Sequence, residues 1–236
     1  MKALSPILAA MLFLAACDSS TSESDNALSG YWSFNDEFTV DNSGNGNDAI
    51  SHGAQLDDGV IGNSANLMGS GYLEIPDNGD FESYDRSFSV WIYKSTASIF
   101  SGFEAIAWKG PESGANLAFS LALENVGPPF KVSLTAGDGA DTLVRVEADS
   151  LIMPGTWYHL VGVVSQLDVT LYVNGRQSAR ADNNGSVARN TDPILLGRVA
   201  ESANAARYFN GRVDEVRYYD RSLDAREASI LFEDGK

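Results

Sequence analysis

The sequence predicts an all-β fold, a sandwich or jelly roll, for the part of the chain that follows residue 27. Short segments there alternate apolar and polar residues, and a period of two is typical of half-buried strands. Clusters of Gly, Pro, Asn and Asp, such as Asp77–Gly79 and Asp182–Gly185, separate about a dozen of these segments. No long amphipathic helix interrupts them, and there is no internal repeat, which indicates a single domain.

The individual strands follow from the same alternation. The clearest are Phe88–Tyr93, Leu117–Leu123, Lys131–Leu134 and Leu143–Glu147. The strongest element is a β-hairpin, in which Asp168–Val173 and Arg176–Arg180 flank Asn174-Gly175. Asn-Gly supplies the two positive φ angles of a type I′ turn, the tight turn that joins antiparallel strands.

Only the C-terminal segment has helical character. Ser222 can cap a helix over Leu223–Phe232. The apolar residues of this segment, which can dock onto a sheet, are Leu223, Ile230, Leu231 and Phe232. The sequence thus predicts one short C-terminal helix on an all-β body.

The first residues have the composition of an export signal. Lys2 precedes an apolar run that ends at Ala16 and is too short to span a membrane comfortably. The stretch Leu14–Cys17, LAAC, resembles the lipobox of bacterial lipoproteins, and the resemblance implies cleavage before Cys17 and a lipid on its sulfur. We expect a signal peptide over residues 1–16 and a lipid anchor at Cys17. The alternative is a plain secretory signal whose cysteine is coincidental.

The residues after the cysteine indicate which membrane the protein occupies and how the folded domain is tethered to it. Asp18 resembles the signal that retains some lipoproteins at the inner membrane. It favours the periplasmic face of the inner membrane of a bacterial cell envelope, with the outer membrane as the alternative. Residues 17–27 are polar and acidic without periodicity, as expected of a flexible linker between a lipid anchor and a folded domain at residues 28–236.

The chain is strongly acidic, with 32 Asp and Glu against 16 Lys and Arg and a net charge of −16. Nucleic acid and anionic lipid are therefore poor electrostatic partners. Such a charge also serves solubility alone, so it identifies no ligand. Cys17 is the only cysteine, so no disulfide can form within the chain, and stability must come from the core or from metals.

Several motifs in one order resemble a single family. They are Tyr31–Phe34 followed by the loop Asp41–Asp48 (DNSGNGND), Trp157–Leu160 followed by Leu171–Gly175, and Phe209–Tyr219, with Gly71–Pro76 and Arg221–Asp224 fitting as well. Over roughly residues 28 to 232 the chain resembles the laminin G-like, concanavalin A-like jelly-roll family. The resemblance implies two large curved antiparallel sheets packed face to face. The same sandwich serves lectins, adhesion modules, glycosidases and lyases, so function must come from residues.

The loop DNSGNGND is rich in the oxygen ligands that calcium takes. It is not an EF-hand, because His52 stands at the twelfth position, where a bidentate glutamate is required. In the family a calcium is often held between such a loop and the C-terminal strand, where Asp214 matches. The resemblance therefore implies a structural calcium held by Asp41, Asn45 and Asp214 with backbone oxygens such as that of Gly44. Asp36 and Glu37 lie nearby in the sequence and are alternative ligands. The alternative is a solvated turn that uses Asn and Asp for local hydrogen bonds.

Catalytic patterns are weak. Glu147 and Asp149 have the two-residue spacing of glycosidases on this fold, but the second glutamate of the laminarinase-type pattern is absent after Ser150. No serine elbow surrounds His159, and His52 and His159 are too far apart in sequence to suggest a zinc site. We interpret His159 as a packed strand residue and expect no enzymatic activity. A polysaccharide-degrading glycosidase or lyase is the less favoured alternative.

Sugar sites on sandwiches use aromatic faces flanked by amide and acid groups. The candidate ligand-binding residues are Phe100, Phe103, Trp108 and Tyr208, each of which can equally be a core residue. The leading hypothesis is a lipid-anchored, non-catalytic module of the bacterial envelope that binds a glycan or a protein partner. The alternative is a structural or adhesion subunit that docks another envelope protein without a small ligand.

Overall fold

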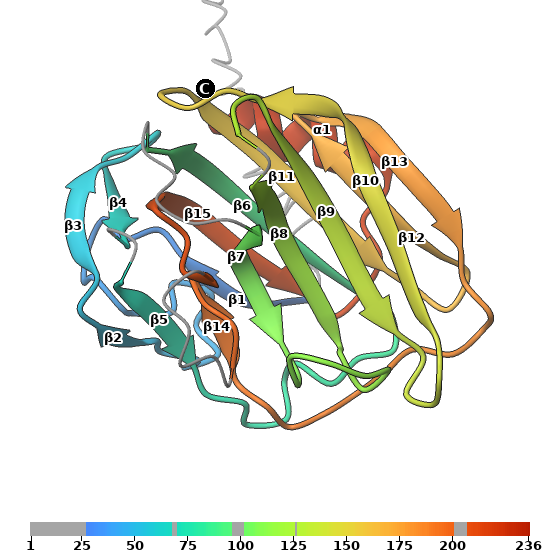
Figure 1. The fold of residues 1–236 in the computed structure, drawn as a ribbon. Helices are drawn as coiled ribbons and strands as arrows, with labels where there is room; N and C mark the ends of the chain where they lie inside the picture. The colour runs from blue at the N-terminus through green and yellow to red at the C-terminus, as the bar shows by residue number, and fades with distance from the viewer. Residues whose placement is uncertain (1–26, 68–69, 96–101, 126, 201–206) are drawn as a thin grey trace, which may run out of the picture.

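The computed structural model describes residues 27–67, 70–95, 102–125, 127–200 and 207–236. Two antiparallel β-sheets are stacked face to face, and one short helix lies near the C-terminus (Figure 1). The all-β sandwich predicted from the sequence is confirmed. The signal peptide, Cys17 and Phe100 lie outside the described residues. Within the described ranges, no helix has the length and apolar character needed to cross a membrane.

The first layer is named sheet A. Its strands are, from one edge to the other, β13 (Arg176–Asp182), β12 (Asp168–Val173), β11 (Trp157–Val164), β6 (Arg86–Lys94), β15 (Gly211–Tyr219), β4 (Asn63–Asn66) and β3 (Gln55–Asp58). β1 (Leu28–Trp32) pairs with Val216–Tyr219 of β15, whereas β4 pairs with Arg212 and Val213. Two strands thus share one side of β15, and the change of partner occurs around Asp214.

The facing layer is named sheet B. Its strands are, in order, β10 (Leu143–Ile152), β9 (Phe130–Gly137), β8 (Phe119–Asn125), β7 (Gly102–Lys109), β14 (Ile194–Leu196), β5 (Tyr72–Ile75) and β2 (Ile50–His52). In Figure 1 this layer lies in front of sheet A. The face of each sheet that points away from the other sheet is called its outer face.

The predicted hairpin is confirmed. β12 and β13 pair antiparallel, and Asn174 and Gly175 have φ angles of +49° and +73°. Two successive positive φ angles are what a type I′ turn requires. The local sequence signal was sufficient here because the turn depends on two adjacent residues alone.

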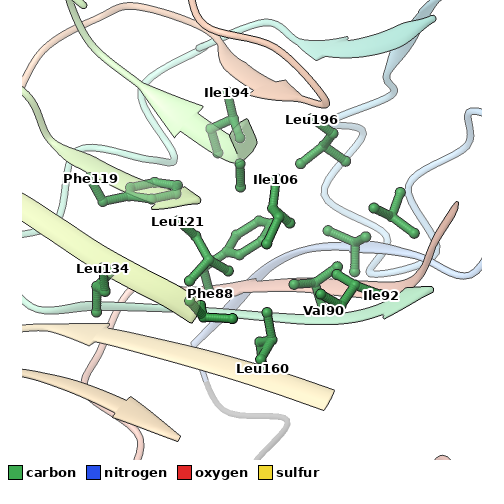
Figure 2. Close-up of a cluster of buried hydrophobic side chains, with 14 of the residues drawn as sticks. Phe88, Val90, Ile92, Ile106, Phe119, Leu121, Leu134, Leu160, Ile194 and Leu196 are labelled. Atoms are coloured by element: carbon green, nitrogen blue, oxygen red, sulfur yellow. The ribbon is translucent and has the colours of Figure 1, made fainter. Parts of the chain in front are cut away.

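The hydrophobic core lies between the sheets and is formed by alternate residues of the strands. Figure 2 shows its centre, where Phe88, Val90, Ile92 and Leu160 of sheet A meet Ile106, Phe119, Leu121, Leu134, Ile194 and Leu196 of sheet B. These side chains are almost fully buried. Each contributes about 1.5–3 kcal/mol relative to an exposed position. Because successive residues of a strand point to opposite faces, the intervening residues are available for sites on the outer faces.

Helix α1 (Ala225–Asp234) packs on the outer face of sheet A. The predicted C-terminal helix is confirmed, but its start was wrong, because Asp224 rather than Ser222 is the N-cap. Asp224 forms a capping box in which its side chain accepts from the Glu227 N–H and the Glu227 carboxylate accepts from the Asp224 N–H. Leu223 remains outside the helix and is buried against sheet A.

Candidate functional site on the outer face of sheet B

Side chains on the outer face of sheet B form rows across neighbouring strands. The register places Trp108 of β7 opposite Ser120 of β8, and Ser120 opposite Thr135 of β9. Thr135 in turn lies opposite Arg145 of β10. Ser133 points to the same face as Thr135, two residues away. A cleft of about 180 Å³ lies over these residues.

One wall of the cleft is aromatic. The rings of Phe103 and Trp108 are stacked, with 5.8 Å between their centroids and 10° between their planes. Trp108 is almost fully buried, and its indole N–H donates to the Gly110 carbonyl at 2.9 Å. The guanidinium of Arg207 lies 4.3 Å from the centroid of the Phe103 ring. The protein therefore holds this apolar surface in place before any ligand arrives.

The floor of the cleft carries small hydroxyl groups. Ser120, Ser133 and Thr135 line it and are buried within the sheet surface. Ser133 Oγ donates to Glu124 Oε1 at 2.9 Å. The hydroxyls of Ser120 and Thr135 form no hydrogen bond within the described part of the chain. Since a hydroxyl donates one hydrogen bond and accepts two, this floor can bind polar groups of a ligand.

The charged groups around the cleft are paired. Arg145 Nη2 lies 2.7 Å from Glu124 Oε1 and 3.1 Å from Glu147 Oε1. Arg207 Nη1 lies 2.8 Å from Glu112 Oε1. Both carboxylates that line the cleft, those of Glu112 and Glu124, are therefore held by an arginine. Among the residues that the structure describes, the cleft has no two unpaired carboxylates of the kind used in glycoside hydrolysis.

Three of the four predicted ligand residues are described, and all three lie on this outer face. Phe103 and Trp108 line the cleft. Tyr208 lies beside it, because it forms an isolated bridge with Ala105 of β7 and its ring centroid is 6.3 Å from that of Tyr72. Trp108 also belongs to a small apolar cluster on this face. Trp108 therefore packs in this cluster and also lines the cleft.

The polar half of the cleft was missed in the sequence. It consists of Ser120, Glu124, Ser133, Thr135 and Arg145. A signal was present, because small hydroxyl residues occupy outward positions in the alternating segments. An outward serine looks like any surface serine, however, until the register of the sheet aligns it with its neighbours.

The two histidines have structural contacts. His159 is fully buried, and its Nε2 lies 2.8 Å from Ser89 Oγ. Burial, with a smaller contribution from Arg217, lowers the pKa of His159 to about 3. Its interpretation as a packed strand residue is confirmed, since no substrate can reach this pair. His52 stacks on Tyr72 with 4.3 Å between the ring centroids.

The DNSGNGND loop is organised by the carboxylate of Asp41. Its Oδ1 accepts from the N–H groups of Tyr31 and Ser43, and its Oδ2 accepts from the N–H of Asn47, each at 2.9 Å. Burial opposes ionisation, but hydrogen bonds from these three residues hold the pKa of Asp41 below its ordinary value. The Asp41 N–H donates to Asp48 Oδ1 at 2.9 Å. The two ends of the loop are thereby joined.

The same loop covers the side of β1 that does not face β15. The Asn42 N–H donates to the Tyr31 carbonyl at 2.7 Å, and Asn42 Oδ1 accepts from the Ser33 N–H at 3.2 Å. Asn47 Nδ2 donates to the Ser29 carbonyl at 2.8 Å. The loop therefore satisfies backbone groups that a further strand would otherwise pair with, which is one way of protecting an edge strand.

Asp214 is fully buried where β15 changes partner. Its Oδ2 accepts from the N–H groups of Val60 and Ile61 at 2.8 and 3.1 Å, and its Oδ1 accepts from the Glu215 N–H at 2.7 Å. Burial raises the pKa of Asp214 to about 7, while these hydrogen bonds act in the opposite direction. Asp214 thus fastens the turn between β3 and β4 to β15.

The predicted calcium ligands have separate partners in the structure. Asp41 and Asp214 bind different backbone segments, and Asn45 Nδ2 donates to the Leu28 carbonyl at 2.8 Å. Gly44, with φ of +89°, lies in an open part of the loop. Within the described residues, no group of three or more His, Cys, Asp or Glu side chains could hold a metal ion. Both carboxylates accept hydrogen bonds from backbone N–H groups, and the calcium site stays a prediction.

Comparison with known proteins identifies a family that matches this chain. The Laminin_G_3 model, described as the Concanavalin A-like lectin/glucanases superfamily, matches residues 67–229. Usherin from Rattus norvegicus is 23% identical over 180 residues, and the N,N-dimethylformamidase beta subunit from Paracoccus aminophilus is 23% identical over 187. These matches cover 66% and 69% of this chain but 4% and 24% of the two relatives, so the chain spans a small part of each.

Three solved structures resemble the fold. The binding domain of Paraclostridial Mosquitocidal Protein 1 has a TM-score of 0.74 and 19% identity, over 89% of this chain and 52% of that one. Domain 4 of AbnA, a GH43 extracellular arabinanase from Geobacillus stearothermophilus, was solved in complex with arabinotriose. It has a TM-score of 0.67 and 22% identity, over 86% of this chain and 97% of that one. The binding domain of Botulinum neurotoxin DC in complex with rat synaptotagmin II has a TM-score of 0.64 and 13% identity, over 90% of this chain and 52% of that one. At these identities the likeness shows the fold alone.

Proposed function

Because the chain belongs to the Concanavalin A-like lectin/glucanases superfamily, whose sandwich serves binding and catalysis alike, we propose that it is a non-catalytic recognition module for a neutral glycan. The ligand lies in the cleft of sheet B. The observation that carries the proposal is the stacked Phe103–Trp108 wall beside a floor with the hydroxyls of Ser120 and Thr135, which have no hydrogen-bond partner among the described residues.

The chemistry of the cleft matches that of a sugar ring. A sugar presents an apolar C–H face and a rim of hydroxyl groups, so it packs on an aromatic surface and hydrogen-bonds beside it. Phe103 and Trp108 supply the surface. Ser120 and Thr135 supply hydroxyls that donate and accept, and the ion-paired Glu124 keeps acceptor lone pairs for ligand hydroxyls.

The charge balance favours a neutral ligand. The carboxylates of Glu112 and Glu124 are matched by the guanidinium groups of Arg207 and Arg145. An anionic or cationic ligand would have to displace one of these pairs without gaining a free counter-charge. Domain 4 of AbnA, which shares the fold, was solved in complex with arabinotriose, and this supports a short neutral oligosaccharide as the ligand class. The cleft of about 180 Å³ would hold one ring of it.

A protein partner is the second candidate. It is supported by the binding domain of Botulinum neurotoxin DC, which shares the fold and was solved in complex with rat synaptotagmin II. Such a partner would use the same outer face, where Leu143 is about half exposed at the mouth of the cleft. The polar floor of the cleft favours the glycan, because a protein docking site usually has an apolar centre.

The location of the module belongs to the proposal as well. A lipid on Cys17 would hold the domain at a membrane of the bacterial envelope, with residues 18–27 as the tether. We expect the wild-type chain in the membrane fraction and the Cys17→Ser variant in the soluble fraction of a bacterial expression host. A wild-type chain that is cleaved but soluble would favour the plain secretory signal.

The glycan proposal is tested by nuclear magnetic resonance titration of residues 17–236 with Cys17→Ser, which retain every residue that the structure describes. The probes are arabinotriose, xylotriose and cellotriose. We expect at least one of them to shift the backbone amides of Ser120, Ser133 and Thr135 in a saturable way. Thr135→Val, which removes a hydroxyl but keeps the volume, should weaken this binding about tenfold.

The matched control is Ser229→Ala, which removes an exposed hydroxyl from helix α1 on the other sheet. It should leave the affinity unchanged. The proposal fails if none of the three trisaccharides shifts amides in the cleft, or if Thr135→Val and Ser229→Ala bind equally well. Capture of an envelope protein through this face, lost in Leu143→Asp, would then favour the protein partner.

A further inference from the structure

A second cavity lies on the opposite side of the molecule, on the outer face of sheet A. It has a volume of about 370 Å³ and lies between the β12–β13 hairpin and the segment that leads into α1. Val163 of β11 and Thr170 of β12 are register partners and form part of its floor with Tyr172. Ser222 and Leu223 form the wall on the helix side.

Two hydroxyls of this cavity lack a partner within the described residues. Ser222 Oγ is buried and forms no hydrogen bond. The Tyr172 hydroxyl also forms none, although the side chain is 6% exposed. Ser222 Oγ has no accessible surface, whereas the Tyr172 hydroxyl is not among the buried atoms without a partner and keeps some accessible surface. Tyr172 lines the cavity, so its hydroxyl can hydrogen-bond to a ligand there.

The rim of the cavity adds ordered acceptors. Asp168 Oδ1 accepts from Thr170 Oγ1 and its Oδ2 accepts from Arg180 Nη2, each at 2.9 Å. Asp85 Oδ1 accepts from the Gln166 N–H at 3.1 Å. Both carboxylates keep free lone pairs, because a carboxylate has about four acceptor positions. With two carboxylates and one guanidinium, the rim is net negative and disfavours anionic ligands.

The phenol of Tyr172 is suited to donate. Burial, followed by the negative charges of Asp168 and Asp224, raises the pKa of Tyr172 above its ordinary value. The group therefore keeps its proton at neutral pH and can donate to a ligand oxygen. Leu167, which is 77% exposed, adds an apolar surface at the mouth.

We propose that this cavity is a second binding site, which takes a neutral polyol of one or two sugar rings. The volume is near the lower end of the range of about 300–1,000 Å³ for ligand pockets, which suits a ligand of that size. The Tyr172 hydroxyl donates to one of its oxygens, Asp168 and Asp85 accept from its hydroxyls, and Leu167 covers an apolar face. The site does not depend on the cleft of sheet B, with which it shares no residue.

Two sites on opposite outer faces would make the module bivalent. One domain could then bind two chains of a glycan, or two segments of one chain, and the second contact would strengthen the first through effective concentration. Such a device suits a domain that must stay attached to an extended polymer.

The test uses the same residues 17–236 with Cys17→Ser, and amide shifts of Thr170, Tyr172 and Gln177 as the readout. The probes are the methyl pyranosides of glucose, galactose, mannose and arabinose, with methyl glucuronide as the anionic comparison. We expect at least one neutral glycoside to cause saturable shifts at these amides. Methyl glucuronide should cause none, because Asp85 and Asp168 repel its carboxylate.

Tyr172→Phe removes the hydroxyl that can reach the ligand and keeps the packing, so it should weaken binding about tenfold. Tyr93→Phe, another hydroxyl deletion on sheet A, is the matched control and should bind like the wild type. Thr135→Val separates the two sites, since it should weaken trisaccharide binding in sheet B and leave these shifts intact. The proposal is overturned if no neutral glycoside shifts the three amides, or if Tyr172→Phe binds as well as Tyr93→Phe.

Discussion

At the scale of single residues, the sandwich buries charges that connect its two layers. Lys94 of sheet A and Glu104 of sheet B form an ion pair with 3.2 Å between Nζ and Oε2, and both side chains are almost fully buried. The Asn210 carbonyl accepts from Lys94 Nζ, and the Asn210 N–H donates to Glu104 Oε2. Removing the two charges from water costs free energy, and their attraction offsets this cost. The pair therefore matters mainly because each charge neutralises the other.

Removal of one partner should therefore cost more than removal of both. We expect Lys94→Met to lower the free energy of unfolding by about 3–5 kcal/mol, because it removes the positive charge that neutralises the buried Glu104 carboxylate. The double variant Lys94→Met/Glu104→Leu should recover most of this loss. Urea denaturation of the three proteins measures the difference. Equal stability of the single and double variants would show that the buried charge is not the cause.

His159 gives stability a definite pH dependence. In the unfolded chain histidine takes up a proton near pH 6.5, whereas the folded-state pKa is about 3. Between about pH 3 and pH 6.5, the unfolded state therefore binds more protons than the folded state. His159 lowers the free energy of unfolding as the pH falls through this range, by up to about 1.4 kcal/mol per pH unit. Asp214 has the opposite effect, since its pKa is raised to about 7 and protonation favours the folded state.

Comparison with a variant isolates the histidine. We expect the free energy of unfolding of His159→Gln to fall less steeply with acidification than that of the wild type, because the contribution of Asp214 is common to both. Urea denaturation at several pH values between about 7 and 4 measures the two slopes. Parallel slopes would mean that His159 is protonated in the folded protein.

At the scale of elements, the DNSGNGND loop acts as a substitute for a strand beside β1. The Asp41 carboxylate accepts from three N–H groups, and Asn42 and Asn47 pair with backbone groups of β1. Asn and Asp are suited to this because their short side chains carry the donor and acceptor groups of a peptide unit. The abundance of oxygen in the loop thus has a structural explanation that needs no metal.

Truncation of Asp41 should loosen both the loop and the strand. We expect Asp41→Ala to lower the free energy of unfolding by about 1–3 kcal/mol, since it leaves three N–H groups without their acceptor. Asp41→Asn, which keeps one acceptor oxygen, should cost less. Ser186→Ala in an exposed loop is a neutral comparison. Hydrogen exchange of the Tyr31 and Asn47 amides should accelerate in Asp41→Ala, and unchanged protection would contradict the edge-cap role.

At the scale of the whole molecule, the two outer faces differ. Helix α1 covers part of sheet A and leaves the cavity beside Tyr172, whereas sheet B presents the cleft with Phe103 and Trp108. The loop at Asp41 and the buried Asp214 both stabilise the region where β1 and β4 meet β15. A calcium held between them would join the two ends of the chain, as the family resemblance implies.

The calcium hypothesis predicts a measurable stabilisation. A site that binds only the folded state adds about 2.7 kcal/mol at a hundredfold excess of calcium over the Kd, which raises Tm by several degrees. Melting curves in EDTA, calcium, magnesium and zinc test this. A rise specific to calcium that is lost in Asp41→Ala and in Asp214→Ala would establish the site. Identical Tm values in EDTA and calcium would leave the loop with its edge-cap role alone.

Prediction from sequence succeeded where the signal was local. The alternation of Phe88–Tyr93 and the Asn174-Gly175 turn were sufficient for strands and a hairpin, because side-chain period and turn angles depend on neighbours in the chain. The helix start was wrong because Ser222 and Asp224 are both good caps. The capping box with Glu227 decided between them.

The sequence by itself determined the all-β class, the hairpin, the C-terminal helix and the family. Only the tertiary structure decided which outward residues meet. Ser120, Thr135 and Arg145 lie on three different strands, and antiparallel register alone brings them into one row. A shift of one residue in any of these strands would turn its polar side chains into the core and remove the cleft. Register depends on the packing of the whole sandwich, and therefore the site could not be derived from any one segment.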